Sequence, residues 1–297
     1  MIPDLLDPIV LGHNSFFGTN HLSRQHGASR EAQFEDVSAI IAVMEAAASF
    51  EVTSMMMSTH PRATGIASAV RGSRTLRDRW SFYPLLPYIT KYVRQANEKG
   101  MINIVIDQLK QAGWTQGLGI LARGGLGALT RDYRQILSTL IGLELAPFRD
   151  LRLKAVFLHD VMTDLVLALD LPDVLEFYTT EIAKRFDARA GFATKNLPLL
   201  THRFQQYGFE RPLVLAQVNS IGFGMNPSRA ACEQVLASAD LQVMAMGTLA
   251  SGYLQPEEAY SYVFAQRAVK SVVVGVSTPA HAAATFTAIR GACAAVR

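Results

Sequence analysis

The sequence has few charged residues and only two cysteines. Asp, Glu, Lys and Arg make up 18% of the 297 residues, and the formal net charge is +3. No run of five or more Lys and Arg residues occurs, so the chain lacks the basic segment typical of proteins that bind nucleic acid. Cys232 and Cys293 stand in no metal-binding spacing, and we expect both to be reduced thiols.

Long apolar runs are missing as well. The longest falls short of the ~20 residues that a transmembrane helix needs. The start "MIPDLLDPIV" lacks the basic segment and long apolar run of a signal peptide. We therefore expect a cytoplasmic protein that does not act at a membrane. Hydrophobic residues make up 49% of the chain, which is enough for a large core.

Short apolar runs alternate with longer segments of helical periodicity. This rhythm is typical of β/α units, in which a parallel sheet is buried on both faces. The eight runs lie at residues 8–12, 51–57, 81–86, 153–158, 189–194, 212–218, 241–246 and 271–276. Eight such units predict a (β/α)8 TIM barrel that spans residues 1–297 as a single domain.

One connection is much longer than the others. The segment from about residue 89 to 152 exceeds what one helix and two loops require. We expect a helical insertion between the third and fourth strands. In this position it can form a lid over the C-terminal face of the barrel, where it would exclude water.

Polar side chains follow several of the predicted strands. Catalytic residues of parallel barrels lie at the C-terminal ends of strands, so these side chains are expected to meet at one pocket. For proton transfer the candidates are His60, His159, Asp160 and Tyr88. For orienting a small-molecule substrate they are His13, Asn14 and Asn219.

The second strand, in "VTSMMMSTHP", carries three consecutive methionines before His60. Methionine is polarizable and adapts its shape, so it suits a wall that contacts an apolar ligand. We expect Met55 to belong to this substrate-binding wall, with His60 as its one chemical group.

Two further sites have alternative interpretations. Gly275 and Ser277, in "VVVGVSTPAH", lie between a strand and a helix start, which favours either a phosphate site or an ordinary helix cap. The strand-end histidines can also hold a divalent metal. No HxH or HExxH spacing supports that alternative, so a metal is not favoured.

The chain resembles the aldo-keto reductase superfamily. The segments "LAQVNSIGF", "VMAMGTLASGYLQPEEAYSYVF" and "SVVVGVSTPAHAAATFTAI" are similar to its last three strands and their helices. "FLHD" and "GFATKN" resemble its fourth and fifth strands. The resemblance implies a (β/α)8 barrel, carbonyl reduction and an NADP(H) site.

Individual roles follow from this resemblance by position. His159 matches the family's active-site histidine. Gln217, Thr194 and Asn196 would hold the nicotinamide carboxamide, and Ser277 would lie near the cofactor phosphate.

The remaining catalytic groups of the family do not match. The family's aspartate falls at about Met55, its tyrosine on His60, and its lysine near Pro87 or Tyr88. Methionine neither donates a proton nor holds charge. After the eighth strand no basic residue precedes Arg290, whereas the family usually places one there to bind the 2′-phosphate.

The sequence therefore leaves three functional classes open. The first is a lyase, isomerase or hydrolase that uses strand-end histidines for acid–base chemistry. The second is an NAD(P)H-dependent carbonyl oxidoreductase in which His60 or Tyr88 replaces the usual tyrosine. The third is a ligand-binding protein without catalysis. Oligomeric state is undetermined by the sequence.

Overall fold

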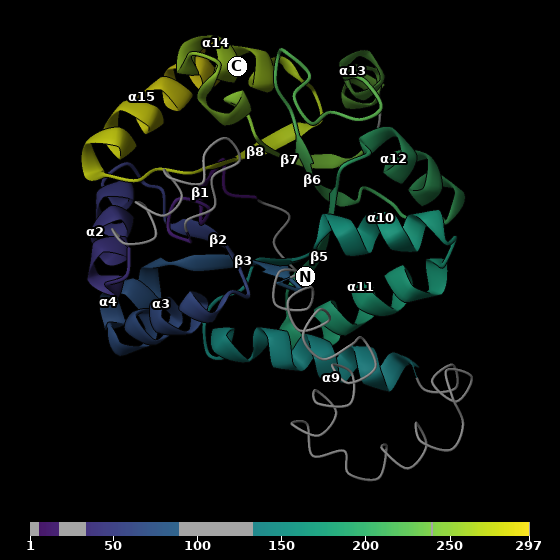
Figure 1. The fold of residues 1–297 in the computed structure, drawn as a ribbon, viewed down its shortest axis with the longest axis horizontal. Coiled ribbons are helices and arrows are strands. Elements are labelled where there is room, and N and C mark those ends of the chain that lie inside the picture. The colour runs from purple at the N-terminus through teal and green to yellow at the C-terminus, as the bar shows by residue number, and fades with distance from the viewer. Residues whose placement is uncertain (1–5, 18–33, 89–132, 239, 297) are drawn as a thin grey trace.

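The computed structural model describes residues 6–17, 34–88, 133–238 and 240–296. Within them, parallel strands close into a barrel in chain order, and helices surround it as a ring (Figure 1). This confirms the expected (β/α)8 TIM barrel. The strands are β1 (Ile9–Gly12), β2 (Ser54–Ser58), β3 (Ser81–Leu86), β4 (Ala155–Leu158), β5 (Arg189–Thr194), β6 (Leu213–Gln217), β7 (Gln242–Met246) and β8 (Val269–Val274).

Helices follow each strand. After β1 and β2 come α2 (Val37–Ala48), α3 (Pro61–Gly72) and α4 (Arg74–Arg79). After β3 and β4 come α9 (Tyr133–Leu145), η1 (Ala146–Phe148), α10 (Asp160–Ala168) and α11 (Pro172–Phe186). The rest are α12 (Leu197–Gln206), α13 (Arg229–Ser238), η2 (Ala250–Gly252), α14 (Pro256–Ala265) and α15 (Pro279–Val296). In the described part of the chain, every helix is too short or too polar to span a bilayer.

Short polar residues begin several of the helices. The side chain of Asp36 accepts a hydrogen bond from Ser38 N at 2.8 Å and starts α2. Ser228 Oγ accepts from Ala231 N at the start of α13. Thr278, not Ser277, caps α15, because its hydroxyl accepts from His281 N at 3.1 Å.

The pleat of the strands separates two apolar layers. Inside the barrel, Val10, Met56, Tyr83, Phe157 and Met244 pack in one buried cluster. The intervening residues of the same strands pack against the surrounding helices in a larger cluster. Successive side chains point to opposite faces of a strand, so each strand of the barrel supplies both layers.

The three methionines of β2 divide between these layers. Met56 faces the barrel interior, whereas Met55 and Met57 lie in the layer beneath the helices and are fully buried. The expectation that Met55 lines a substrate pocket is corrected by this arrangement. Because side chains alternate along the strand, Met55 points away from the barrel interior.

The predicted insertion is only partly described. Residues 89–132, where a lid was expected, lie outside the described residues. The remainder forms α9, which takes the place of the helix after β3 and packs beside α11 (Figure 1). Ser138 Oγ donates to Glu181 Oε1 at 2.6 Å and joins these two helices.

Candidate functional site

The carboxyl ends of the strands bring polar residues to one mouth of the barrel. Leu213 and Leu215 of β6 face the interior, so Gln217 continues that inner row. By the same alternation, Phe157 in β4 is followed by His159, and Ala193 in β5 by Lys195. Contacts across the mouth support this placement, because Lys195 reaches both Gln217 and Asp160.

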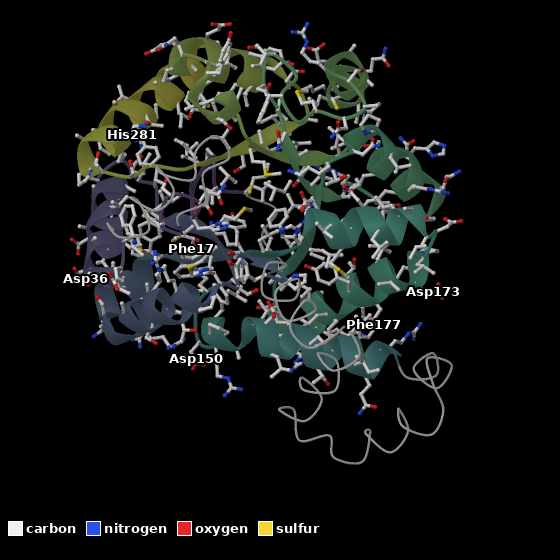
Figure 2. The ribbon with its side chains drawn as sticks, viewed as in Figure 1. Phe17, Asp36, Asp150, Asp173, Phe177 and His281 are labelled. Atoms are coloured by element: carbon white, nitrogen blue, oxygen red, sulfur yellow. The ribbon has the colours of Figure 1, made fainter. Side chains whose placement is uncertain are left out.

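A row of rings crosses the adjoining side of the mouth. His13 and Phe17 have ring centroids 5.1 Å apart, and Phe17 stacks on His60 at 4.5 Å. His60 meets Tyr88 edge-on at 4.8 Å. Figure 2 shows Phe17 inside the ring of helices, beside β1 and β2. The loop after β1 and the ends of β2 and β3 therefore place three candidate residues together.

His13 lies at the centre of the histidine group. Its pKa is lowered to about 4, chiefly by burial and also by the nearby charges of His60 and His159, against the raising effect of a hydrogen bond to the Met56 backbone. Its Nδ1 lies 3.2 Å from the carbonyl oxygen of Met56, which can only accept a hydrogen bond. His13 is therefore neutral at pH 7, with its proton on Nδ1 and an acceptor at Nε2.

His60 has the opposite arrangement of ring nitrogens. It precedes Pro61, the first residue of α3, and its Nδ1 accepts a hydrogen bond from Arg62 N at 3.1 Å. A neutral imidazole whose Nδ1 accepts carries its proton on Nε2. His60 can thus donate a hydrogen bond to a substrate oxygen.

His159 forms a pair with Asp160. Its Nδ1 is 2.5 Å from Asp160 Oδ1 and 3.3 Å from Val161 N. Val161 N also donates to Asp160 Oδ1 at 2.9 Å. The shorter contact assigns the Nδ1 proton to the bond with the carboxylate, since charge-assisted hydrogen bonds are the stronger ones. In its neutral form, His159 presents Nε2 as a base.

The carboxylate of Asp160 stays ionised despite its burial. Burial alone would raise its pKa, but the hydrogen bond and charge of His159, together with the Lys195 ammonium, hold the pKa at about 2. Lys195 Nζ lies 3.3 Å from Asp160 Oδ2. A permanent negative charge beside His159 stabilises the imidazolium that forms when this ring takes a proton.

Two residues of the site were not among the expected catalytic or binding groups. Lys195 follows the fifth predicted strand, within "GFATKN", but the sequence assigned it no role. Its inward direction could have been inferred from Gly191 and Ala193, which precede it at intervals of two residues.

Glu144 was missed altogether, because it stands at the end of a helix 85 residues after Thr59. Its buried Oε2 accepts from the Thr59 hydroxyl and from Tyr88 N, the latter at 3.2 Å. It thereby ties α9 to the ends of β2 and β3. No local pattern in the sequence identifies this role.

Asn14 and Asn219, both expected to orient substrate, lie in different surroundings. Asn14 is exposed in the turn after β1. Asn219 is fully buried, and its amide binds the backbone of the β6–α13 loop, donating to Phe223 O at 2.9 Å and accepting from Phe223 N at 2.8 Å. Its side chain is engaged in shaping that loop.

The three residues expected to hold a nicotinamide carboxamide also have internal partners. Thr194 is buried, and its hydroxyl donates to Asp164 Oδ1 at 2.5 Å. Asn196 Oδ1 caps α12 by accepting from Leu199 N at 3.1 Å. With its amide oriented so that both ends find partners, Gln217 donates to Phe223 O at 2.7 Å and accepts from Lys195 Nζ at 3.1 Å. These side chains do not form a vacant amide cradle, and the described site does not fit that part of a cofactor.

The residues expected to bind the cofactor phosphate also differ from a phosphate site. Gly275 is exposed after β8, and Ser277 is half-buried before the cap of α15. Within the described residues, the first turn of α15 carries no Lys or Arg, and Arg290 binds Phe50 O and Glu51. His281 lies on α15 at the periphery of the molecule (Figure 2). The predicted phosphate site therefore has backbone N–H groups but no Lys or Arg in the first turn of α15.

The barrel mouth shows no metal site among the described residues, and two cavities of the molecule lie away from it. In the described ranges, no three His, Cys, Asp or Glu residues are grouped as metal ligands. One cavity of about 490 Å³ lies beside Asp7, Phe50 and Arg290 at the amino-terminal side of β1. Another of about 430 Å³ lies between α9 and α11. Neither is lined by the histidines of the mouth.

Comparison with known proteins shows similarity in fold but none in sequence families. No protein-family model matches the sequence, and no curated protein is significantly similar to it. Solved structures are similar in fold. A Pseudomonas aeruginosa protein assigned to the aldo-keto reductases shares 14% identity with a TM-score of 0.60, covering 97% of this chain and 91% of that one.

Two other aldo-keto reductases have related structures. The Bacillus halodurans protein in its holo form shares 10% identity, with a TM-score of 0.55 and coverage of 89% and 88% of this and that chain. The Klebsiella pneumoniae protein in complex with NADPH shares 15% identity, with a TM-score of 0.52 and coverage of 96% and 86%. The chain has the fold of the aldo-keto reductase superfamily.

Proposed function

We propose that the chain is a small-molecule enzyme that transfers protons at the barrel mouth without hydride transfer, as a lyase, isomerase or hydrolase. The observation that carries this proposal is the opposite orientation of the imidazoles of His60 and His159, both of which act on His13. His60 Nδ1 accepts from Arg62 N, whereas His159 Nδ1 donates to Asp160. One ring is thus set to donate to an oxygen and the other to accept a proton.

This pairing suits a substrate with a carbonyl group. Hydrogen bonding from His60 Nε2–H stabilises negative charge that develops on the carbonyl oxygen. His159 Nε2 removes a proton from the adjacent carbon, and Asp160 stabilises the imidazolium that results. Tyr88 and His13 complete the polar wall, and exposed Asn14 lies in the same β1 turn as His13.

Deuterium exchange tests the proposal without knowledge of the natural substrate. The protein would be incubated in D2O with a panel of small aldehydes, ketones and 2-oxo acids, and exchange at the carbon next to the carbonyl followed by NMR. We expect catalysed exchange with at least one compound, lost in His159→Gln. His202→Gln is the matched control, because His202 is exposed on α12. Equal exchange in the two variants would contradict the assignment.

A second candidate is an NAD(P)H-dependent carbonyl oxidoreductase in which His60 or Tyr88 supplies the proton. The likeness in fold to the NADPH-bound Klebsiella pneumoniae protein favours it. The internal partners of Thr194, Asn196 and Gln217 speak against it. Fluorescence titration with NADPH and NADH decides between the candidates. Saturable binding with oxidation of the cofactor by a carbonyl compound would replace the first proposal with the second.

A further inference from the structure

The amine of Lys195 is held at the mouth by residues of two elements, α10 and β6. Asp164 Oδ2, on α10, accepts from Lys195 N at 2.9 Å and fixes the backbone at the end of β5. Asp160 Oδ2 and the Gln217 amide oxygen then receive the side chain at 3.3 and 3.1 Å. The side chain remains 47% exposed. The amine is therefore directed and also accessible to a small molecule.

The imidazole of His159 and the amine of Lys195 bind the same carboxylate. His159 binds Oδ1 of Asp160, and Lys195 binds Oδ2 of the same carboxylate. One carboxylate thus holds an amine and an acid–base group side by side. A nucleophilic lysine with an adjacent proton acceptor is the requirement for covalent catalysis through an imine.

A second lysine–aspartate pair, Lys154 and Asp7, lies at the other end of the barrel. Lys154 also pairs with a carboxylate, its Nζ lying 2.7 Å from Asp7 Oδ1. Asp7 receives its second hydrogen bond from the Tyr83 hydroxyl, at 2.7 Å. Within the described residues, no histidine forms a hydrogen bond or ion pair with Lys154 or Asp7. Lys154 therefore serves as a structural ion pair, and the histidine distinguishes the pair at the mouth.

We infer that Lys195 forms an imine with the carbonyl carbon of a small aldehyde, ketone or 2-oxo acid substrate. This inference rests on the proposed acid–base function and names its substrate class. The structural basis is the shared carboxylate of Asp160, which places the amine of Lys195 next to His159.

The chemistry is balanced without an oxidant or reductant. Lys195 gives one proton to His159, and its nitrogen lone pair attacks the carbonyl carbon. The carbonyl oxygen takes up two protons, one from the attacking nitrogen and one returned by His159, and leaves as water when the carbon–nitrogen double bond forms. The protonated imine then accepts the electron pair of a broken C–H or C–C bond at the next carbon, giving an enamine. Protonation of the enamine and addition of water release the product and restore the amine.

Reductive trapping tests the inference directly. The full chain would be incubated with cyanoborohydride and either pyruvate or glycolaldehyde, and the modified lysine located by peptide mass spectrometry. We expect one adduct per chain at Lys195, absent in Lys195→Arg and retained in Lys154→Arg. Thermal melts of both variants would verify folding. Modification of Lys195 no faster than that of exposed Lys270 would overturn the inference.

Combined outcomes separate this inference from the function on which it rests. Deuterium exchange that persists without an adduct removes the imine and leaves the acid–base proposal standing. An adduct at Lys195 in a protein whose exchange is unaffected by His159→Gln supports the imine and removes the role assigned to His159. Absence of both adduct and exchange overturns both.

Discussion

His60 and His159 hold equivalent places in the chain, yet their Nδ1 atoms have opposite hydrogen-bonding roles. Each follows a strand and precedes the first residue of a helix, α3 or α10. His60 is followed by proline, and its Nδ1 accepts a hydrogen bond from the backbone N–H of Arg62. His159 is followed by Asp160, whose carboxylate takes the Nδ1 proton at 2.5 Å. One residue after each histidine thus decides the tautomer.

Replacing Asp160 with Asn should reduce proton transfer. An amide in place of the carboxylate neither stabilises imidazolium nor fixes the Nδ1 proton, so the deuterium-exchange rate should fall by about 100-fold. Asp164→Asn is the matched comparison. Asp164 accepts hydrogen bonds from the Thr194 hydroxyl and Lys195 N, and among the described residues it forms no hydrogen bond or ion pair with His159. A smaller loss for Asp160→Asn than for Asp164→Asn would contradict the assignment.

Replacing His60 with Asn should separate helix capping from chemistry. Asn accepts the Arg62 N–H as a cap, so the free energy of unfolding should stay within about 0.5 kcal/mol of the wild type. The imidazole Nε2–H is lost, and exchange should fall at least about tenfold. His60→Leu should lose activity and also about 1 kcal/mol of stability. Urea denaturation and exchange rates would be compared, and full activity in His60→Asn would exclude this donor role.

The low pKa of His13 should make stability depend on pH. The unfolded residue binds a proton below pH 6.5, whereas the folded residue does so only near pH 4. Between these values the unfolded state holds more protons, so the free energy of unfolding falls as the pH is lowered. At pH 5 the loss from this residue should be about 2 kcal/mol.

Urea denaturation at pH 7 and pH 5 measures this effect. His13→Gln should weaken the pH dependence, and His202→Gln, at an exposed position of α12, should leave it unchanged. The same slope in all three proteins would show that His13 is not the responsible group.

Removing the Glu144 carboxylate should loosen α9 from the barrel. Glu144→Ala leaves the Thr59 hydroxyl and Tyr88 N without this acceptor, which should cost about 2 kcal/mol of unfolding free energy. Glu181→Ala, which removes a helix–helix bond to Ser138 farther from the mouth, is the control for activity. We expect Glu144→Ala to lower exchange as well, because Tyr88 contacts the His60 ring. Unchanged stability of Glu144→Ala would refute the anchoring role.

Much of the architecture could be predicted because it depends on patterns close together in the chain. β3 and β5 begin and end at the expected residues, and the remaining strands overlap their predicted runs. β2 begins three residues later than expected, at Ser54. Apolar runs of this length identify buried parallel strands, and their ends indicate where polar groups meet.

Individual roles at the mouth were harder to predict. Asn219 and Asn196 have the residue type of ligand-binding groups, yet their amides complete loops and helix starts. A polar side chain at a strand end has backbone groups competing for it, and the sequence does not tell which partner prevails.

The sequence by itself determined the closed barrel and the set of histidines at its carboxyl end, because strand alternation and chain order are local properties. Only the tertiary structure decided that Lys195 shares Asp160 with His159, that Glu144 joins α9 to Thr59, and that Met55 faces the helices. These contacts depend on how distant segments meet when the barrel closes. Hydrogen-bond geometry at such meetings is set by packing in three dimensions, which residue spacing alone does not encode.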